Sequence, residues 1–248
     1  MKSPLTPISI ISAYKNNLGD LLPLPVRMAQ CTPDTYTAIM NIAKDLAKKG
    51  GKLILSDLFR SYDMQMQSHL DFISGKKRAF SPPPGGSFHE AGRAFDLDLD
   101  AMKISLADFW IMAAKYGVTP IIKQPKANVS EAWHFDRRGS HQIVYDYYEN
   151  RKGNNFKPYA AAAASAILSI GVHVDVFGAN QQQAALQSCL IRLGKEIGNI
   201  DGHMGRKTQI ALEESGIVFD PANISNMMIQ VENIVQQKFS NEFTLPPP

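Results

Sequence analysis

The chain has 248 residues, of which 44% are apolar and 20% charged, with a formal net charge of +3. This length suits one large domain or two small ones with a real hydrophobic core. The slight positive charge gives no reason to expect a nucleic-acid partner. No apolar run approaches the ~18 residues needed to cross a bilayer, and the N-terminal run Ile8-Ser9-Ile10-Ile11 is too short for a secretory signal. We therefore expect no membrane span and no signal peptide, and we expect a monomer.

The first part of the chain alternates between predicted helices and strands. Apolar spacing predicts helices over 34–49, 62–74 and 105–116, each followed by glycine. Short apolar or alternating runs predict strands over 52–56, 95–100 and 133–135. We expect residues 1–157 to form an α+β domain, in which a small antiparallel sheet with flanking helices carries the functional side chains.

The composition changes after Pro158. An alanine-rich helix is predicted over 159–170, with Pro158 suited to its first position. Further helices are predicted over 181–193, 206–214 and 221–239. We expect residues 158–240 to form a small all-α domain and residues 241–248 to be a disordered tail.

Neither cysteine predicts a disulfide or a metal site. Cys31 and Cys189 lie far apart in the sequence and have no metal-ligand spacing. We expect both to be buried as small apolar side chains.

Two short stretches carry the candidate chemistry. The first runs Ser87-Phe88-His89-Glu90-Ala91-Gly92-Arg93-Ala94-Phe95-Asp96, and the second is Glu131-Ala132-Trp133-His134. Two histidines and one aspartate form a three-ligand set that leaves the fourth position of zinc to water, as in catalytic zinc sites. A glutamate that is not a ligand suits the general base of a metal hydrolase. On chemistry alone, Asp98 is as good a ligand as Asp96, because both face the same side of the predicted strand.

The spacing Ser-x-His-x-x-Gly-x-Ala-x-Asp followed by Glu-x-Trp-His resembles that of the zinc D-Ala-D-Ala metallopeptidases, relatives of the lysostaphin-type endopeptidases and of the hedgehog signalling domain. The resemblance implies a fold of that type and one zinc ion per chain, with His89, Asp96 and His134 as ligands. It implies that Glu131 takes a proton from the zinc-bound water and returns it to the leaving amine. Glu131 and His134 face one zinc only if the chain turns between them.

The same resemblance assigns three further site residues. Arg60-Ser61, with Gln65 four residues after the serine, fits the family's Arg-Ser pattern. Arg60 is the expected positive partner of the developing oxyanion and of a substrate carboxylate, because its planar fork binds two oxygens. Gln65 and Ser87 are expected to contact the substrate.

The second part of the chain has a resemblance of its own. Gln187-x-x-Leu-x-x-Leu-Gly194, followed by Asp201-Gly202-x-x-Gly205-x-x-Thr-x-x-Ala211, looks like the helical peptidoglycan-binding domain attached to cell-wall hydrolases. The usual aromatic-Gln ending is replaced by Glu214-Ser215. These residues build turns and helix contacts more than they bind a ligand.

The combined pattern predicts a zinc-dependent peptidase that hydrolyses peptidoglycan stem peptides in the cell wall, of the D-Ala-D-Ala carboxypeptidase type. The enzyme alternative is an L-Ala-D-Glu or cross-link endopeptidase, acting as a phage endolysin or a secreted antibacterial effector. The non-enzyme alternative is an inert, hedgehog-like zinc-binding module. Without a signal peptide, the protein is expected to reach the periplasm or wall by non-Sec export or phage lysis. Because all predicted site residues precede Pro158, truncation there is expected to leave hydrolysis of small stem peptides unchanged.

Overall fold

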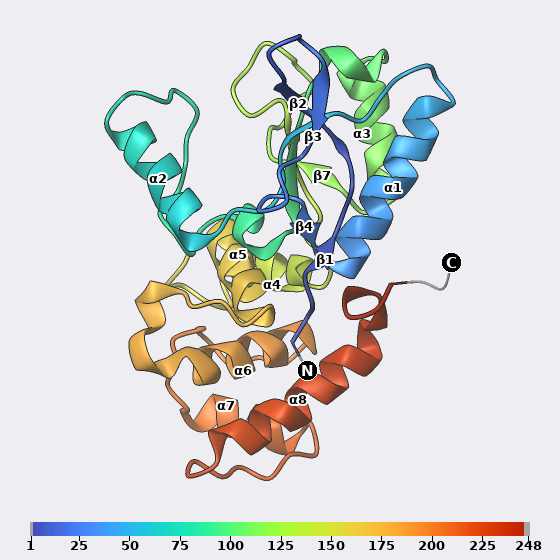
Figure 1. Cartoon of the computed structure of the whole chain (residues 1–248). Coiled ribbons are helices and arrows are strands. Elements are labelled where there is room, and N and C mark those ends of the chain that lie inside the picture. The colour runs from blue at the N-terminus through green and yellow to red at the C-terminus, as the bar shows by residue number, and fades with distance from the viewer. Residues whose placement is uncertain (1, 246–248) are drawn as a thin grey trace.

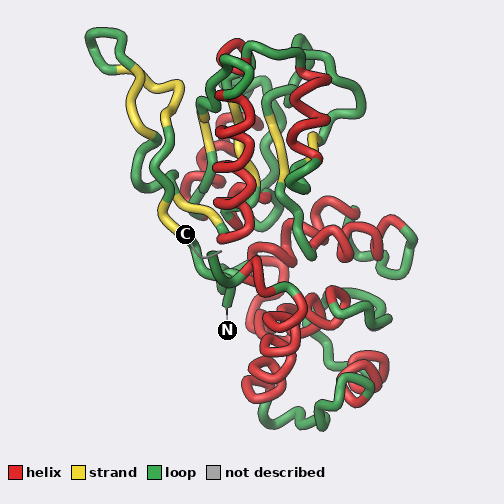
Figure 2. The backbone as a smooth tube through the Cα atoms, turned by 90° about the vertical axis from the view of Figure 1, so that its right-hand side faces the viewer, coloured by secondary structure: helices red, strands yellow, loops and turns green. Residues whose placement is uncertain are grey.

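The computed structural model describes residues 2–245 and has a mixed α/β architecture. A sheet with helices occupies the upper part of Figure 1, and helices without strands occupy the lower part. Figure 2 shows the same division from the side, with the strands confined to the upper part. No helix within residues 2–245 is both long and apolar enough to cross a membrane.

The main sheet has six strands in the order β3-β2-β5-β6-β8-β7. Their bounds are Ile11–Lys15 (β2), Leu21–Pro23 (β3), Leu55–Asp57 (β5), Ala94–Leu97 (β6), Thr119–Pro120 (β7) and His134–Asp136 (β8). A separate two-stranded sheet pairs β1 (Thr6–Pro7) with β4 (Gln30–Cys31). The expected antiparallel sheet is in fact mixed, because β2 and β5 pair in parallel. The helix α1 (Pro33–Ala47) lies in the connection between them, as a parallel pair requires.

Three helices accompany the sheet, at the places that apolar spacing predicts. Helix α1 buries Ile39, Ile42 and Leu46 completely, and α3 (Leu106–Ala114) buries Phe109. Helix α2 (Tyr62–Ile73) instead projects away from the sheet (Figure 1), and Gln65 is its one buried residue. It therefore contributes little to the core beside the sheet.

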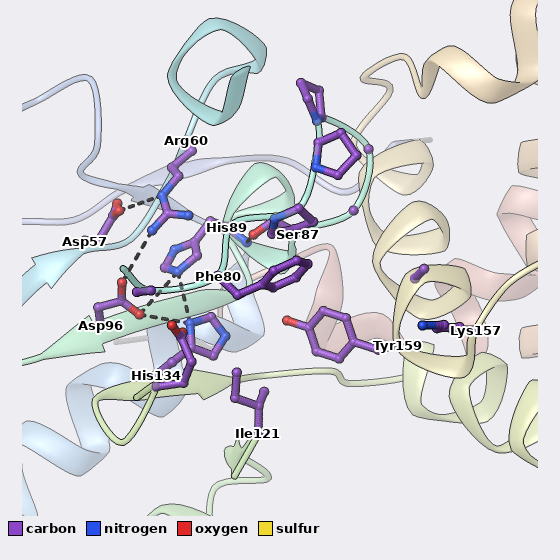
Figure 3. Close-up of a pocket in the computed structure, with 18 of the residues that line it drawn as sticks. Asp57, Arg60, Phe80, Ser87, His89, Asp96, Ile121, His134, Lys157 and Tyr159 are labelled. Atoms are coloured by element: carbon purple, nitrogen blue, oxygen red, sulfur yellow. Dashed lines mark hydrogen bonds and ion pairs between the residues drawn. The ribbon is translucent and has the colours of Figure 1, made fainter. Parts of the chain in front are cut away.

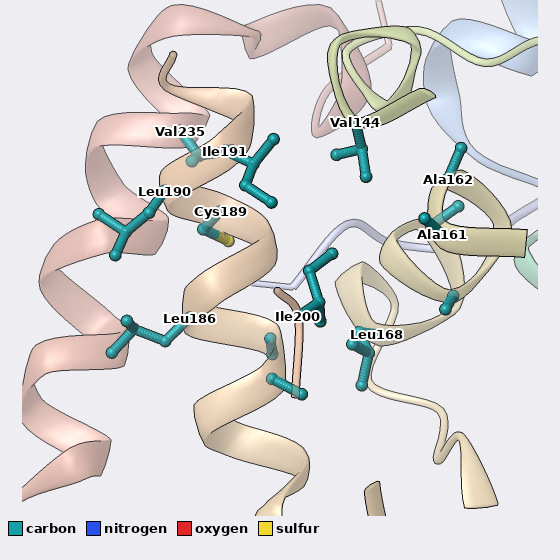
Figure 4. Packing of buried hydrophobic residues seen from close by; sticks show 14 of the residues in the cluster. Val144, Ala161, Ala162, Leu168, Leu186, Cys189, Leu190, Ile191, Ile200 and Val235 are labelled. Carbon is teal, nitrogen blue, oxygen red and sulfur yellow. The ribbon is translucent and has the colours of Figure 1, made fainter. Parts of the chain in front are cut away.

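The lower part contains α4 (His141–Glu149), α5 (Pro158–Ser169), α6 (Gln181–Arg192), α7 (Arg206–Glu213) and α8 (Ile224–Lys238), with a short 3₁₀ segment, η3 (Asp175–Asn180). Every residue from Ala161 to Leu168 in α5 is buried, and the small alanines let neighbouring helices approach closely. Figure 4 shows this packing between α5, α6 and α8. The same cluster contains Phe88 and Ala91, so one hydrophobic core crosses the expected boundary at residue 157.

Gln187 shows the structural role of the sequence pattern over residues 187–211. Its side-chain oxygen accepts from the backbone N–H groups of Asp201 (2.9 Å) and Gly202 (2.7 Å). Its amide donates to Asp201 Oδ1 and to the His203 carbonyl, both at 2.9 Å. The signature residues thus build the turn, as expected. Both cysteines are buried and free, which confirms their predicted role.

The C-terminal segment is ordered further than the sequence suggested. Residues 240–242 form the 3₁₀ turn η4 (Ser240–Glu242), and Glu242 is 2% exposed. Its carboxylate contacts Arg192 at 2.7 Å and Arg93 at 3.3 Å. Residues 241–245 therefore do not form the disordered tail we expected, because two buried guanidinium groups hold this carboxylate. The remainder of the expected tail, 246–248, lies outside the described residues.

Candidate active site

Three buried ligand atoms converge at the centre of the sheet (Figure 3). Asp96 Oδ1 lies 2.9 Å from His134 Nδ1 and 3.4 Å from His89 Nε2. The two histidine nitrogens lie 3.2 Å apart. Zinc bonds of ~2.0–2.1 Å in tetrahedral geometry place neighbouring ligand atoms about 3.3–3.4 Å apart. The triangle and its two-imidazole, one-carboxylate chemistry therefore fit three corners of a zinc site, with the ligands that the motif implied.

Local backbone features bring the three ligands together. His89 lies in the short 3₁₀ helix η1 (Phe88–Ala91), which ends at Gly92 with a left-handed φ of 61°. A Cβ at Gly92 would approach Cys31 Cα to 2.9 Å, so the position favours glycine on two grounds. The chain then enters β6, where Asp96 pairs directly with His134 of β8.

The outer nitrogen of each histidine has a hydrogen-bond acceptor. His89 Nδ1 donates to the Leu58 carbonyl at 2.7 Å, and His134 Nε2 donates to Asp136 Oδ1 at 2.9 Å. Each bond fixes the proton on the outer nitrogen and leaves the inner nitrogen free to bind a metal. Asp136 was not predicted as a site residue, although residues two apart on a strand share a face.

The electrostatics of the ligand cluster follow from burial and from the opposite charges of its members. Burial alone would raise the pKa of Asp96, but the two neighbouring histidines hold it well below its usual range. Burial alone would lower the pKa of His134, but the carboxylates of Asp136 and Asp96 raise it to about 10. The cluster therefore favours a cation at its centre.

Glu131 lines the same cleft, on the loop before β8. Its φ of 67° is unusual for a residue with a side chain. The His134 N–H donates to the Glu131 carbonyl at 3.1 Å, which closes the turn that the motif required. Burial raises the pKa of Glu131. The structure thus places a carboxylate of raised pKa beside the three ligands.

Arg60 is fixed by three side chains rather than left free for substrate. Its Nε donates to Asp57 at 2.6 Å, Nη1 to Gln65 at 3.2 Å and Nη2 to Asp96 Oδ2 at 3.4 Å. It therefore orients the second oxygen of a predicted ligand while still lining the cleft. Asp57 was not predicted, and no sequence pattern pointed to it.

Gln65 does not occupy the expected substrate-contact position. It is 0% exposed and does not line the cleft. Its amide donates to the Pro82 carbonyl at 2.6 Å and to Ser81 at 3.1 Å. The Gln65 side chain is therefore buried on the inner side of α2, where its hydrogen bonds link Arg60 to the proline-rich loop.

Ser87 lines the cleft, but its hydroxyl has a structural partner. The hydroxyl accepts from the His89 N–H at 3.3 Å, and Glu90 accepts from the Ser87 N–H at 3.2 Å. This reciprocal cap fixes the start of η1. Glu90 also accepts from the Gly85 N–H at 2.9 Å, and burial raises its pKa to about 7.

Asp98 does not join the site. Strand β6 ends at Leu97, so the expected strand face with three aspartates does not form. Asp98 Oδ1 instead accepts from the N–H groups of Asp100 (3.0 Å) and Ala101 (3.3 Å). Short aspartates compete for nearby backbone donors in this way, and here the competition ends the strand.

The cleft has a volume of about 720 Å³ and is bounded by both parts of the chain. Besides the ligands, its walls include the apolar side chains of Phe80, Ile121, Trp133, Phe156, Val174 and Val176. Tyr159 also lines it, and its hydroxyl donates to Asp136 at 3.2 Å. The predicted site residues all precede Pro158, but the cleft that holds them is also lined by residues that follow it.

Lys77 adds a second cation to the cleft. It is half-buried, and its Nζ donates to Ser68 at 2.9 Å. Within residues 2–245 no carboxylate forms an ion pair with it. Burial and the nearby Arg60 lower the pKa of Lys77.

No protein-family model and no curated protein matches the chain. Among solved structures, it is similar to the LdcB LD-carboxypeptidase, described for its peptidoglycan recognition, with a TM-score of 0.41 and 18% identity over 53% of this chain. The match spans 66% of the LdcB chain, just under two thirds. It is also similar to the L,D-carboxypeptidase DacB from Streptococcus pneumonia, with a TM-score of 0.34 and 21% identity over 54% of this chain and 85% of the other.

Proposed function

We propose that this chain is a zinc-dependent peptidase that hydrolyses peptidoglycan stem peptides, of the D-Ala-D-Ala carboxypeptidase type. The observation that carries the proposal is the triangle formed by His89, Asp96 and His134, with Glu131 facing the same cleft. A purely structural zinc site fills all four positions with protein ligands. Three ligands beside a non-ligand carboxylate favour catalysis over an inert metal-binding module.

The proposed reaction divides the work between the metal and Glu131. Bound at the three ligand atoms, zinc supplies a Lewis acid that acidifies a water and polarises a peptide carbonyl. Glu131 accepts the proton of the attacking water and returns it to the leaving amine. Its raised pKa suits both steps, because proton transfer is most effective when the pKa of the catalytic group is close to the working pH.

The two cleft cations have different proposed tasks. Arg60 is already paired with Asp57 and Asp96, so it orients Asp96 and adds positive charge near the developing oxyanion. Lys77 has no carboxylate partner among the described residues and binds the free carboxylate of the substrate. A half-buried cation with no carboxylate in direct contact favours an anionic ligand, and stem peptides end in a carboxylate.

The size of the cleft favours a second candidate, cleavage within the stem or at a cross-link. A volume of about 720 Å³ falls in the range of ~300–1,000 Å³ that holds a drug-sized ligand. This volume gives room for several peptide residues. The same catalytic groups serve either reaction, and only the bond presented to them differs.

Digestion of defined muropeptides by the zinc-loaded protein tests the proposal. Mass spectrometry is expected to show loss of the C-terminal D-alanine from a pentapeptide stem. Cleavage between L-Ala and D-Glu, or of a cross-linked dimer, would support the endopeptidase instead. A protein that binds zinc and leaves every stem peptide intact would contradict the proposal and support the inert module.

A further inference from the structure

We propose that Tyr159 is a positioning residue of the metal centre, which it completes from the helical part of the chain by holding Asp136 and, through it, His134. This inference rests on the proposed metal site. Tyr159 donates its hydroxyl proton to Asp136 Oδ1 at 3.2 Å, and the same oxygen accepts from His134 Nε2 at 2.9 Å. Figure 3 shows the tyrosine reaching from the right, where the helices lie, with its oxygen directed toward His134.

The tyrosine ring has a fixed position. It lies in the first turn of α5, directly after Pro158, whose ring presets the helical backbone. The ring packs edge-on against Phe88 with 5.4 Å between centroids, and the Arg138 guanidinium lies 5.6 Å from its centroid. Phe88 directly precedes His89, so Tyr159 contacts the segments that carry two of the three predicted ligands.

Asp136 needs the hydroxyl because it is fully buried. A buried carboxylate is costly unless its oxygens are hydrogen-bonded. Its Oδ1 serves His134 and Tyr159, while Oδ2 accepts from Arg138 Nε at the longer distance of 3.4 Å. Burial and Asp136 itself raise the pKa of Tyr159 far above its ordinary value, so the phenol keeps its proton and remains a donor.

The two histidines differ in how they are held. The acceptor for His89 is the backbone carbonyl of Leu58, which no side-chain substitution removes. The acceptor for His134 is a side chain that is itself held from another part of the fold. Loss of an outer partner typically weakens metal binding 10–100-fold. The His134 side of the site therefore depends on the helical part, and truncation at Pro158 should damage the centre rather than spare it.

The test compares Tyr159→Phe with Tyr145→Phe in the full chain. Tyr145 also packs against Arg138, with 4.5 Å from the guanidinium to its ring, but its hydroxyl has no hydrogen bond within residues 2–245. The readouts are zinc affinity by chelator competition, the absorption spectrum of the cobalt(II)-substituted protein, and thermal unfolding without metal. Loss of Asp136 itself should weaken zinc binding roughly 10–100-fold. We expect Tyr159→Phe, one hydrogen bond further out, to weaken it by up to roughly 10-fold and to alter the cobalt spectrum, while Tyr145→Phe leaves both unchanged.

A double-mutant cycle tests whether Tyr159 affects zinc affinity through Asp136. In an Asp136→Asn background, Tyr159→Phe should cost little further zinc affinity, because the two residues act in series. Additive losses, or a Tyr159→Phe protein that unfolds at lower temperature with zinc affinity unchanged, would overturn the inference. A parent that binds zinc but cleaves no peptide would contradict the proposed function alone, and a parent without zinc affinity would overturn both.

Discussion

Asp96 and His134 lie directly opposite each other on the antiparallel strands β6 and β8, with Asp96 Oδ1 2.9 Å from His134 Nδ1. Two of the three predicted ligands are thus set by strand register rather than by a flexible loop. A slip of one residue would turn either side chain to the other face of the sheet. The aromatic pair Phe95 and Phe135, adjacent in the same register with 6.1 Å between centroids, helps to hold this alignment.

Glu131→Gln separates binding from chemistry. The variant should bind zinc as the parent does but hydrolyse stem peptides roughly 10²–10⁴-fold more slowly, the usual contribution of a general acid–base group. Glu149→Gln, on the exposed end of α4, is the matched control and should retain full activity. Metal analysis and single-turnover hydrolysis measure the two effects. Equal activity of Glu131→Gln and the parent would contradict the mechanism.

The variants Asp96→Asn and Asp98→Asn test which of these two carboxylates binds the metal, because the chemistry of the sequence alone allows either one. Asp96→Asn should lose most zinc affinity, because it removes a ligand charge. Asp98→Asn should keep the metal and lose at most about 1 kcal/mol of stability, since it only weakens a capping interaction. Chelator competition and thermal unfolding on both variants give the answer, and the reverse ranking of zinc affinities would refute the ligand assignment.

Lys77→Met tests the proposed recognition of a substrate carboxylate. We expect KM for a stem peptide with a free C-terminus to rise roughly 10–100-fold, because a hydrogen bond to a charged group contributes about 1.5–3 kcal/mol. An amidated substrate, suitable if cleavage lies further inside the stem, should show no such difference between variant and parent. Lys76→Met, at the exposed neighbouring position, is the control. A variant that raises KM equally for both substrates would exclude this role.

Glu242→Gln tests the junction between the two parts of the chain. Its carboxylate is buried between Arg93 and Arg192 and accepts from the Ser140 N–H at 2.6 Å. Removing one partner of a buried ion pair costs about 3–5 kcal/mol, so denaturant unfolding should show a large loss. Glu213→Gln on the exposed surface of α7 should change stability by less than about 0.5 kcal/mol. Similar stabilities for the two variants would show that the buried network contributes little.

The sequence predicted those features that depend on local pattern. Helices such as α1 and α6 show apolar spacing, and the ligand motifs have fixed spacing over short stretches. Helix α4 was missed because its buried face combines His141 with Val144, Tyr147 and Tyr148 rather than aliphatic residues alone. The strands β2 and β3 were missed because their mostly exposed residues do not alternate.

Contacts between distant segments had no local signal. The hydroxyl of Tyr159 meets Asp136 across the join of the two parts, and Glu242 meets Arg93 from the other end of the chain. Gln65 fitted the motif by spacing, but the direction in which α2 turns it depends on the packed loop at Pro82. Tertiary packing therefore decides the surroundings of the ligands, while the ligands themselves follow from the motif.

Anomalous diffraction at the zinc absorption edge, from crystals of the zinc-loaded protein, tests the central claim most directly. The account predicts one strong peak within ~2.0–2.2 Å of His89 Nε2, His134 Nδ1 and a carboxylate oxygen of Asp96. The outer nitrogens should keep their bonds to Leu58 and Asp136. A peak at Asp98 and Asp100, a metal bound through His134 Nε2, or no peak at these side chains would contradict it.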